Sequence, residues 1–303
     1  MEDGWPVNLS KKGGFIMKKS LFVSLIFGCF LSSQAQNQTD ISLFMRADSA
    51  TYLSEMSSES GDLYTSIGHH GPAVENEWMA VRIYFSRKTA IDIYSKVKPG
   101  LELKQARWYP TVEQQKIGWG ADYYKVSETV GLGGVRLWDG EQVVFLGPVT
   151  NRTARVVKER TSSYMEILSE GVPYQGRKVD ILMRVTVYSG IREAKVEAFA
   201  LTDLPVQFVT GINYHAGEEV ENEDGLIATW GVHPEDVAAE SIALGGAILY
   251  DPADFAAKQD DGTEILLISK PGKQLTTWIS SALAKEKDLN TMEKFLDYLH
   301  ALE

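Results

Sequence analysis

The sequence predicts an all-β protein, a large antiparallel sandwich or barrel that ends in one helix. Two observations carry this prediction. About a dozen short apolar runs are separated by turn residues, and several of them alternate apolar and polar side chains with a period of two. A sheet that covers a core with one face and meets water with the other produces this alternation. Only the carboxyl end shows a helical period.

The expected strands begin after a polar lead-in with one apolar stretch at 41–45. In 180–186, Ile181, Met183 and Val185 fall on one face, and 195–200 alternates in the same way. The full set of expected strands is 79–85, 90–94, 143–146, 154–157, 164–168, 179–188, 194–201, 206–212, 226–230, 241–249, 264–268 and 275–279.

The last segment predicts a helix. Asn290 can cap it, with Glu293 three residues later. One apolar stripe follows, formed by Leu289, Met292, Phe295, Leu296, Leu299 and Leu302. We expect this stripe to pack on a sheet face or edge.

The amino terminus predicts export. Lys18 and Lys19 precede an apolar run at 21–31, and Ser33-Gln34-Ala35 forms a small-residue cleavage site. These features are typical of a secretory signal peptide and are too short for a spanning helix.

Met17 is therefore the expected start, with residues 1–16 as an upstream extension. Lipoprotein cleavage at Cys29 is the less favoured alternative, because only about ten apolar residues precede that position. We expect a periplasmic or secreted protein in which residues 36–303 form a single β-sandwich domain.

Composition limits the partners. Cys29 is the only cysteine, so the mature chain has no disulfide and depends on its hydrophobic core. The formal net charge of −11 disfavours nucleic acid and anionic membranes as partners.

Three motifs are weighed and set aside, so no cofactor and no metal is predicted. The glycines at 131–134 precede a strand-like run rather than the helix of a nucleotide-binding loop. His69 and His70 lack metal-ligand spacing. The acidic run at 218–224 lacks the glycine-punctuated spacing of a calcium loop and indicates a solvated face.

Polar reactive side chains are concentrated between His69 and Trp138. Such cations, aromatics and carboxylates predict a cleft for a polar ligand and suit sugar rings. Ion pairs on a solvated face are the competing interpretation. The concentrated residues are Arg82, Tyr84, Tyr94, Lys96, Trp119, Asp122 and Lys125.

His215 is the strongest candidate for acid–base chemistry. It follows a strand and precedes Ala216-Gly217, so it can reach a cleft. Imidazole groups titrate near neutral pH. His233, at a turn before Pro234, is the weaker candidate.

The concentrated region resembles a long-uncharacterised family of secreted proteins from bacterial polysaccharide-utilisation loci. The resemblance covers most of the mature chain and is most specific over about 70 residues, with Ser95 in place of an expected glycine. Its matching elements are Gly71-Pro72 with Glu75, Arg82 with Tyr84, Asp92 with Lys96, and Trp119-Gly120 with Asp122, Lys125 and the glycines at 131–134.

This resemblance implies a galactose-mutarotase-like super-sandwich and, for some relatives, lyase or dehydratase activity on uronic-acid oligosaccharides. Elimination beside a carboxylate needs a cation, a base and an acid. Arg82 would bind the carboxylate, His215 or Lys125 would be the base, and Tyr84 the acid. The expected substrate-binding residues are His70, Glu75, Tyr94, Lys96, Trp119, Asp122 and Arg136.

The leading interpretation is therefore a carbohydrate-active carbon–oxygen lyase that acts on uronides. Two alternatives stay open. An aldose mutarotase or epimerase would need a histidine acid and a carboxylate base. A non-catalytic oligosaccharide-binding protein would need only the aromatic and charged cleft.

Overall fold

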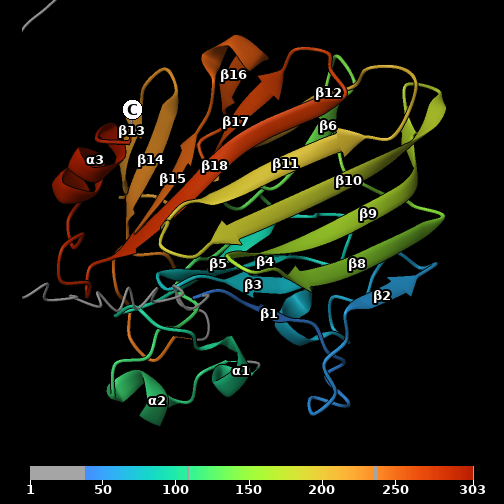
Figure 1. Ribbon diagram of the computed structural model, residues 1–303. Coiled ribbons are helices and arrows are strands. Elements are labelled where there is room, and N and C mark those ends of the chain that lie inside the picture. Colours follow the sequence, from blue (N-terminus) through green and yellow to red (C-terminus); the bar gives the residue numbers. More distant parts are fainter. Residues whose placement is uncertain (1–37, 108, 235–237, 303) are drawn as a thin grey trace, which may run out of the picture. The chain divides into compact units, whose positions relative to one another are not determined.

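Three antiparallel sheets build the part of the chain that the computed structural model describes, residues 38–107, 109–234 and 238–302 (Figure 1). The predicted signal peptide at 17–35, with Cys29, lies outside these residues. The largest sheet has nine strands, in the spatial order β13 (Glu219–Asn222), β14 (Leu226–Gly231), β15 (Leu244–Leu249), β18 (Gln274–Leu283), β11 (Ala194–Ala200), β10 (Arg177–Tyr188), β9 (Ser162–Tyr174), β8 (Asn151–Lys158) and β2 (Glu55–Ser58).

Two smaller sheets accompany it. The five-stranded sheet has the order β16 (Phe255–Asp260), β17 (Glu264–Ser269), β12 (Gln207–Asn213), β6 (Arg136–Trp138) and β7 (Val143–Val144). The four-stranded sheet has the order β1 (Asp40–Ser42), β3 (Ala73–Glu75), β4 (Met79–Ile83) and β5 (Ile91–Ser95).

One apolar core joins all three sheets. Val81 of β4, Ile93 of β5, Ile212 of β12, Met183 of β10 and Ile279 of β18 belong to the same buried cluster. The two small sheets therefore pack against the nine-stranded sheet, and the predicted antiparallel all-β sandwich is confirmed. Close packing of this kind supplies most of the stability of a chain without disulfides.

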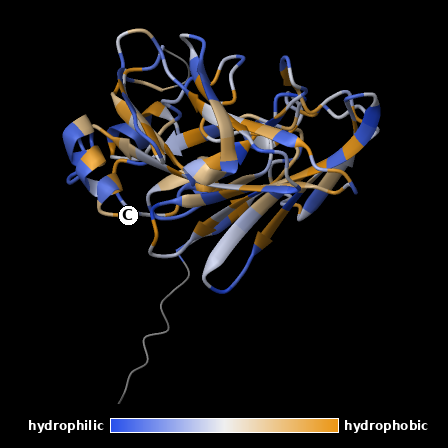
Figure 2. Cartoon of the chain, turned by 90° about the horizontal axis from the view of Figure 1, so that it is seen from above, coloured by the Kyte–Doolittle hydropathy of each residue, from blue (hydrophilic) through white to orange (hydrophobic). Residues whose placement is uncertain are grey.

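The predicted alternation is confirmed strand by strand. In β11, Val196 and Ala198 are buried while Lys195 and Glu197 are half-exposed. β10 alternates in the same way and pairs with β11 in register, Met183 opposite Ala198. Figure 2 shows the resulting change between apolar and polar residues along the strands.

Several elements were not predicted. The short strands β1, β2 and β3 carry too few residues to show a period, and the six residues of β16 do not alternate, whereas β6 matches the strand-like run expected after the glycines at 131–134. The acidic run predicted as a solvated face forms β13, and the run predicted from position 241 becomes strand only at Leu244. The helices α1 (Leu103–Ala106) and α2 (Val112–Lys116) were also missed, although Thr111 and Gln114 form a capping box at α2. Single 3-10 turns lie at Gly68–His70 and Pro252–Asp254.

The predicted terminal helix is α3 (Met292–His300), but its cap is not Asn290. The Thr291 side chain accepts the Lys294 N–H, whereas Asn290 Oδ1 accepts from the Lys294 ammonium. Both residues are good caps, and the local backbone decides between them. Phe295 is fully buried against β14, β15 and β18. It occupies space left by Gly245, where a Cβ would lie 2.7 Å from its ring.

The glycines at 131–134 join two sheets rather than cradle a phosphate. Gly131 has φ +69°, and a Cβ there would lie 1.9 Å from the Ile91 carbonyl oxygen. Leu132 N–H donates to that oxygen, and Gly133 N–H donates to Gly211 O of β12. Glycine is required because only a residue without a side chain allows this approach.

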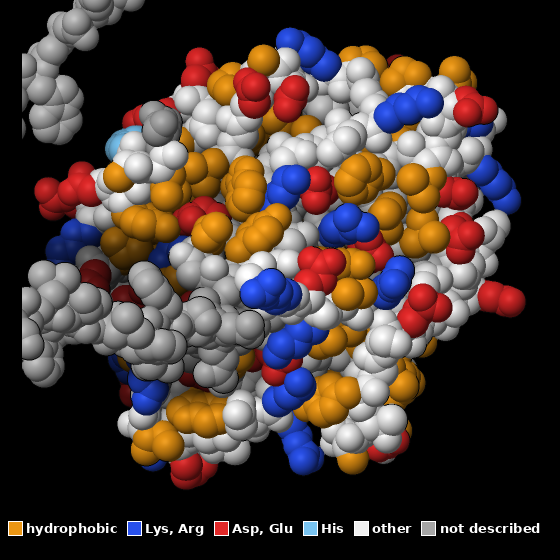
Figure 3. All heavy atoms as spheres, in the orientation of Figure 1, with side chains coloured by type: hydrophobic (Ala, Val, Ile, Leu, Met, Phe, Trp, Pro, Cys, Tyr) orange, Lys and Arg blue, Asp and Glu red, His pale blue; other side chains and the backbone are white. Residues whose placement is uncertain are grey.

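The outer face of the nine-stranded sheet mixes charges of both signs. Figure 3 shows basic and acidic side chains interspersed on the face in view. Arg184 pairs with Glu166, and Lys195 pairs with Glu197 at 2.7 Å. Within the described residues no helix is both long and apolar enough to span a membrane.

We expect Phe295→Ala to lower the free energy of unfolding by about 3 to 5 kcal/mol, because it opens a cavity between α3 and the sheet. Urea unfolding followed by circular dichroism measures the change. Leu302→Ala is the matched control, since Leu302 is 44% exposed, and should stay within about 0.5 kcal/mol. Equal losses in both variants would contradict the packing described for α3.

Candidate functional site

The candidate site lies where the chain passes from the five-stranded to the nine-stranded sheet. β12 ends at Asn213, a turn follows in which Glu218 N–H donates to His215 O, and β13 then begins. His233 follows β14, the partner strand of β13. Pairing of Glu219 with Trp230 therefore brings Glu218 and His233 together although they are 15 residues apart.

A second segment, 121–125, runs alongside this turn. The Asn213 amide donates to Lys125 O at 2.9 Å, and Tyr124 is fully enclosed with its hydroxyl 3.4 Å from Asn213 O. The Tyr124 ring also contacts the His233 ring, with centroids 4.5 Å apart. The end of β12 thus holds the backbone of Lys125 in place.

The peptide groups of Lys125 determine the proton positions on both histidines. Lys125 N–H donates to Nδ1 of His233 at 2.9 Å, so the neutral His233 ring carries its proton on Nε2. His215 Nε2 lies 3.0 Å from Lys125 O, which can only accept, so Nε2 of His215 carries the proton and Nδ1 keeps its lone pair. One residue therefore holds both rings in the same tautomer, with the proton on Nε2, through its N–H for His233 and its C=O for His215.

Glu218 completes what we call the histidine–glutamate cluster: His215, Glu218 and His233. One ring nitrogen of each histidine and a carboxylate oxygen of Glu218 lie within 4.8 Å of one another. The Glu218 and His233 side chains are each 1% exposed, with His233 Nε2 3.3 Å from Glu218 Oε1. Gly231 makes room for the carboxylate, because a Cβ there would lie 2.4 Å from Glu218 Cγ.

Burial sets the protonation of this cluster. Within the described residues neither Glu218 oxygen accepts a hydrogen bond. Desolvation accordingly raises the pKa of Glu218 from its ordinary 4.5 to about 7. Burial and the neighbouring His215 lower the pKa of His233 to about 3, so its ring is neutral at physiological pH. The contact between His233 and Glu218 is therefore not an ion pair.

This arrangement suits proton transfer better than metal binding. The three groups have the donor types of a transition-metal site. However, the tautomer fixed by Lys125 puts a proton, not a lone pair, on the His233 nitrogen that lies 3.3 Å from Glu218 Oε1, although the geometry there makes no hydrogen bond. A carboxyl that titrates near neutrality beside the lone pair of His215 provides a proton donor and a proton acceptor in one place.

Arg82, Tyr84, Asp92 and Asp122 form a second group, which we call the Arg82 cluster. Arg82 Nε donates to Asp92 Oδ2 at 2.9 Å, and Nη2 donates to both Asp92 and Asp122. The Tyr84 hydroxyl donates to the same Asp92 oxygen at 2.5 Å. All four side chains are buried, and burial together with Asp92 raises the pKa of Tyr84. Asp122 and His233 line one small pocket, which places the two clusters side by side.

The charge of the Arg82 cluster bears on its predicted role. One guanidinium faces two carboxylates, so the cluster carries a formal excess of one negative charge. Among the described residues, Arg82 Nη1 is the guanidinium nitrogen that donates to none. The predicted contact with a substrate carboxylate would therefore run through Nη1.

His70 lies beside the Arg82 cluster. Its ring stacks on Tyr64 with centroids 4.0 Å apart and meets the edge of Tyr84 at 5.8 Å. Its Nδ1 donates to Tyr64 O at 2.9 Å. His69 and His70 both have φ values near +55° to +59°, a region that costs energy for residues with a Cβ.

The other predicted binding residues lie in networks that hold the fold. Lys96 donates to Glu75 Oε2, Asn76 O and Gly100 O, each at 2.6 Å. Tyr94 donates to Glu102, which also accepts Gly120 N–H. These hydrogen bonds already use the Lys96 ammonium and the Tyr94 hydroxyl, which a sugar would need as binding partners.

Trp119 and Arg136 are not brought to either cluster by any contact in the described part of the chain. The Trp119 side chain is half-buried, and the backbone N–H of Trp119 donates to Gln114 O at the end of α2. Arg136 donates to Glu128 O, lies 3.8 Å from Glu264 and covers the Phe145 ring.

The sequence did not point to Glu218, and it indicated His233 only as the weaker acid–base candidate. Glu218 stands in an acidic run whose next member, Glu219, is exposed. The available signal was an acidic residue before and a histidine after the segment that forms the β13–β14 hairpin, of which only 226–230 was predicted as a strand. Strand register alone converts that pattern into a contact.

Comparison with known proteins identifies a family and several remote structures. A family model described as "Domain of unknown function (DUF4861)" matches residues 31–303. Among curated proteins none matches the chain in sequence. The chain is similar to a proposed aldose 1-epimerase from Klebsiella pneumoniae subsp. pneumoniae MGH 78578, with TM-score 0.41, 9% identity, and coverage of 87% of this chain and 95% of that one.

Two further solved structures resemble the chain with lower TM-scores. The first is 4-alpha-glucanotransferase from Thermococcus litoralis, with TM-score 0.34, 10% identity, and coverage of 70% of this chain and 37% of that one. The second is a GH36 alpha-galactosidase from Geobacillus stearothermophilus, with TM-score 0.22, 8% identity, and coverage of 76% and 40%. At these TM-scores the likenesses decide nothing about activity.

Glu218→Gln should change how stability depends on pH. Below the ordinary pKa of 4.5 the carboxyl is protonated in both folded and unfolded chains. As pH rises from 4.5 toward 7, only the unfolded chain ionises, so the wild type loses up to about 3 kcal/mol relative to the glutamine variant. Urea unfolding of both proteins between about pH 4 and pH 8 measures this divergence.

Glu219→Gln is the matched control, because Glu219 is adjacent to Glu218 in the sequence and its own carboxyl is exposed. Parallel stability curves for wild type and Glu218→Gln would contradict the raised pKa. A rise in melting temperature on adding Zn²⁺ that requires Glu218 and both histidines would show that the cluster binds metal and would overturn the assigned tautomers.

Proposed function

The chain belongs to the DUF4861 family, and for this member we propose a carbohydrate-active enzyme that uses the histidine–glutamate cluster for acid–base chemistry. The observation that carries the proposal is the pair of histidines whose proton positions are fixed by the Lys125 backbone beside a buried carboxyl with a pKa of about 7. Such groups are required wherever a sugar carbon or hydroxyl exchanges a proton.

We propose elimination on uronic-acid oligosaccharides as the reaction, which makes the protein a carbon–oxygen lyase of polysaccharide breakdown. His215 Nδ1 would take the proton on the carbon next to the substrate carboxylate. The C–O bond one carbon further would break, a C=C bond would form, and Glu218 in its protonated form would give a proton to the departing oxygen. Arg82 Nη1 and the Lys125 ammonium are the cations that could face the substrate carboxylate.

The geometry supports Glu218 over Tyr84 as the acid. The Tyr84 proton is directed to Asp92 at 2.5 Å, and the raised pKa of that hydroxyl keeps it there. Glu218, with its pKa raised to about 7, can still carry a proton near neutral pH, and neither of its oxygens accepts a hydrogen bond within the described residues.

Mutarotation or epimerisation of an aldose is the second candidate. A carboxyl beside a neutral histidine meets the requirement for one acid and one base. The formal negative excess of the Arg82 cluster also favours a neutral sugar over a uronate. Both reactions use the same cluster, and they differ in whether a double bond is formed.

We expect the mature chain to produce an unsaturated uronate from uronic-acid oligosaccharides, seen as an increase in ultraviolet absorbance. His215→Ala should lower kcat by about two to four orders of magnitude, and Glu218→Gln should remove the alkaline limb of the pH profile, the fall in activity as pH rises through about 7. His300→Ala is the matched control, because that histidine lies exposed on α3.

Proton NMR of free aldoses in the same samples distinguishes the two reactions. If the protein speeds the exchange between the two anomers and no increase in ultraviolet absorbance appears, the reaction is mutarotation and not elimination. Full activity of folded His215→Ala would remove the cluster from the mechanism. Arg82→Ala is less informative, because it leaves Asp92 and Asp122 as uncompensated buried charges.

We also propose that residues 17–35 direct export. Expression from Met17 in a bacterial host with a periplasm should yield a protein whose first residue is close to Gln36, as amino-terminal sequencing would detect. A cytoplasmic product that keeps Met17 would contradict export. A lipid-modified product beginning at Cys29 would identify a lipoprotein instead.

A further inference from the structure

A groove of about 480 Å³ lies beside α3 and shares no lining residue with either cluster. Its walls come from α3 and the segment before it, from the β10–β11 turn, and from Trp78 between β3 and β4. We call it the α3 groove. Its lining residues are Trp78, Gly190, Ile191, Arg192, Glu193, Asp288, Leu289, Tyr298 and Leu302.

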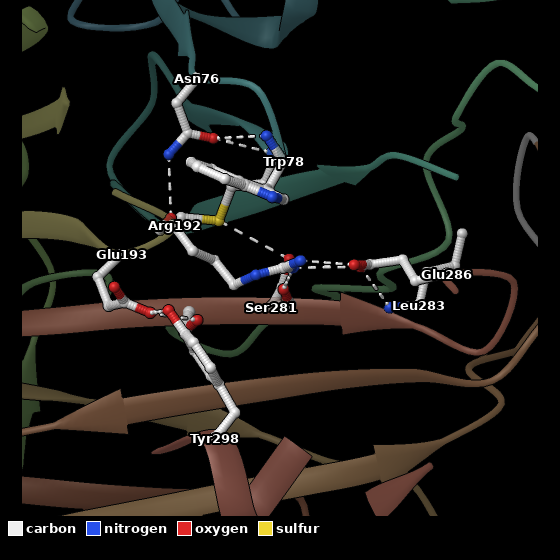
Figure 4. Close-up of polar contacts among 10 residues, drawn as sticks. Asn76, Trp78, Arg192, Glu193, Ser281, Leu283, Glu286 and Tyr298 are labelled. Atoms are coloured by element: carbon white, nitrogen blue, oxygen red, sulfur yellow. Dashed lines mark hydrogen bonds and ion pairs between the residues drawn. The ribbon is translucent and has the colours of Figure 1, made fainter. Parts of the chain in front are cut away.

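The floor of the groove is rigidly built. Arg192 donates to Ser281 O at 2.6 Å and grips both oxygens of Glu286, at 3.1 and 2.5 Å. The Asn76 amide donates to Ile191 O and Arg192 O, which fixes the β10–β11 turn. Figure 4 shows Arg192 extended between Trp78 on one side and Glu193 with Tyr298 on the other.

Two aromatic rings flank the Arg192 guanidinium. Its central carbon lies 5.8 Å from the Trp78 ring centre and 6.0 Å from the Tyr298 ring centre. Both rings are half-exposed, so part of each remains open to a ligand. Flat aromatic surfaces beside polar groups suit the apolar C–H faces of pyranose rings.

Glu193 supplies a hydrogen-bond acceptor. Its Oε1 receives the Tyr298 hydroxyl at 2.7 Å and the Ser280 hydroxyl at 3.1 Å. Its Oε2 receives no hydrogen bond within the described residues, although Glu193 is only 7% exposed. A carboxylate that is fixed through one oxygen while the other is open can accept a sugar hydroxyl.

The charges select a neutral ligand. The charges of Arg192 and Glu286 cancel in their ion pair, whereas Glu193 and Asp288 leave two negative charges at the groove. These charges repel a uronate and leave hydroxyl groups unaffected. We infer that the α3 groove binds a neutral sugar residue of an oligosaccharide, with Trp78 as its platform and Glu193 as its hydroxyl acceptor. This inference rests on the proposed function only in that the ligand is a carbohydrate.

Calorimetric titration and tryptophan fluorescence with cellotetraose, xylotetraose and maltotetraose test the inference, with tetragalacturonate as the anionic counterpart. We expect at least one neutral sugar to bind and tetragalacturonate not to bind in the groove. Trp78→Ala should weaken the neutral sugar by at least about tenfold, Trp78→Phe by less, and Glu193→Gln should also weaken it. Trp278→Ala is the matched control, because Trp278 is a half-buried tryptophan on the nine-stranded sheet.

Ile191→Asp provides a second test that does not depend on the folding of the tryptophan variants, since Ile191 is exposed. It should weaken binding by adding charge at the rim. All titrations are run in the His215→Ala background, and turnover is measured separately with Trp78→Ala in an otherwise native chain. Absence of turnover in the native chain, together with intact binding of the neutral sugar in the groove, would remove the proposed reaction alone.

Three outcomes would overturn the inference. Binding of no neutral sugar, or binding that survives both Trp78→Ala and Ile191→Asp, would exclude the groove as the sugar site. A wild-type dimer that Ile191→Asp converts to a monomer, seen by size-exclusion chromatography with light scattering, would assign the groove to a second copy of this chain.

Discussion

The backbone of Lys125 is the constraint on which the candidate site depends. Its N–H and C=O are each used by a histidine ring, and each hydrogen bond settles where that ring carries its proton. A histidine side chain in water exchanges tautomers freely, so its proton position carries no information. Here a main-chain segment sets both positions at once, and Asn213 at the end of β12 in turn fixes that segment.

The sheets provide this constraint through register rather than through local structure. β12 belongs to the five-stranded sheet, and the β13–β14 hairpin belongs to the nine-stranded sheet. Glu218 and His233 meet because β13 pairs with β14, and the missing side chain of Gly231 leaves the space that Glu218 fills. A slip of one residue would turn Glu218 toward the opposite face of the hairpin.

The buried ionisable side chains are of two kinds, those paired with an opposite charge, which hold the fold, and those without such a pair, which can react. Lys96 with Glu75, and Arg82 with Asp92 and Asp122, place opposite charges in direct contact, so their side chains are held in place. Among the described residues Glu218 is buried without such a partner, and the resulting rise in its pKa is the physical cost of an acid that can release its proton near neutrality. Glu193 in the α3 groove lies between these cases, with one oxygen held by Tyr298 and Ser280.

The sequence by itself determined the sheets and the helix wherever a period could be counted. The long strands β9, β10, β11 and β18 and the helix α3 were predicted from the alternation and the apolar stripe, and His215 was proposed from its position after a strand. Strands of two to four residues carry too few side chains to show a period. Several polar residues singled out for a ligand, such as Lys96 and Tyr94, are instead bonded to Glu75 and Glu102. Only the tertiary structure decided this, because residue type states which hydrogen bonds a side chain can make, whereas the packing of distant segments decides which of them are already made.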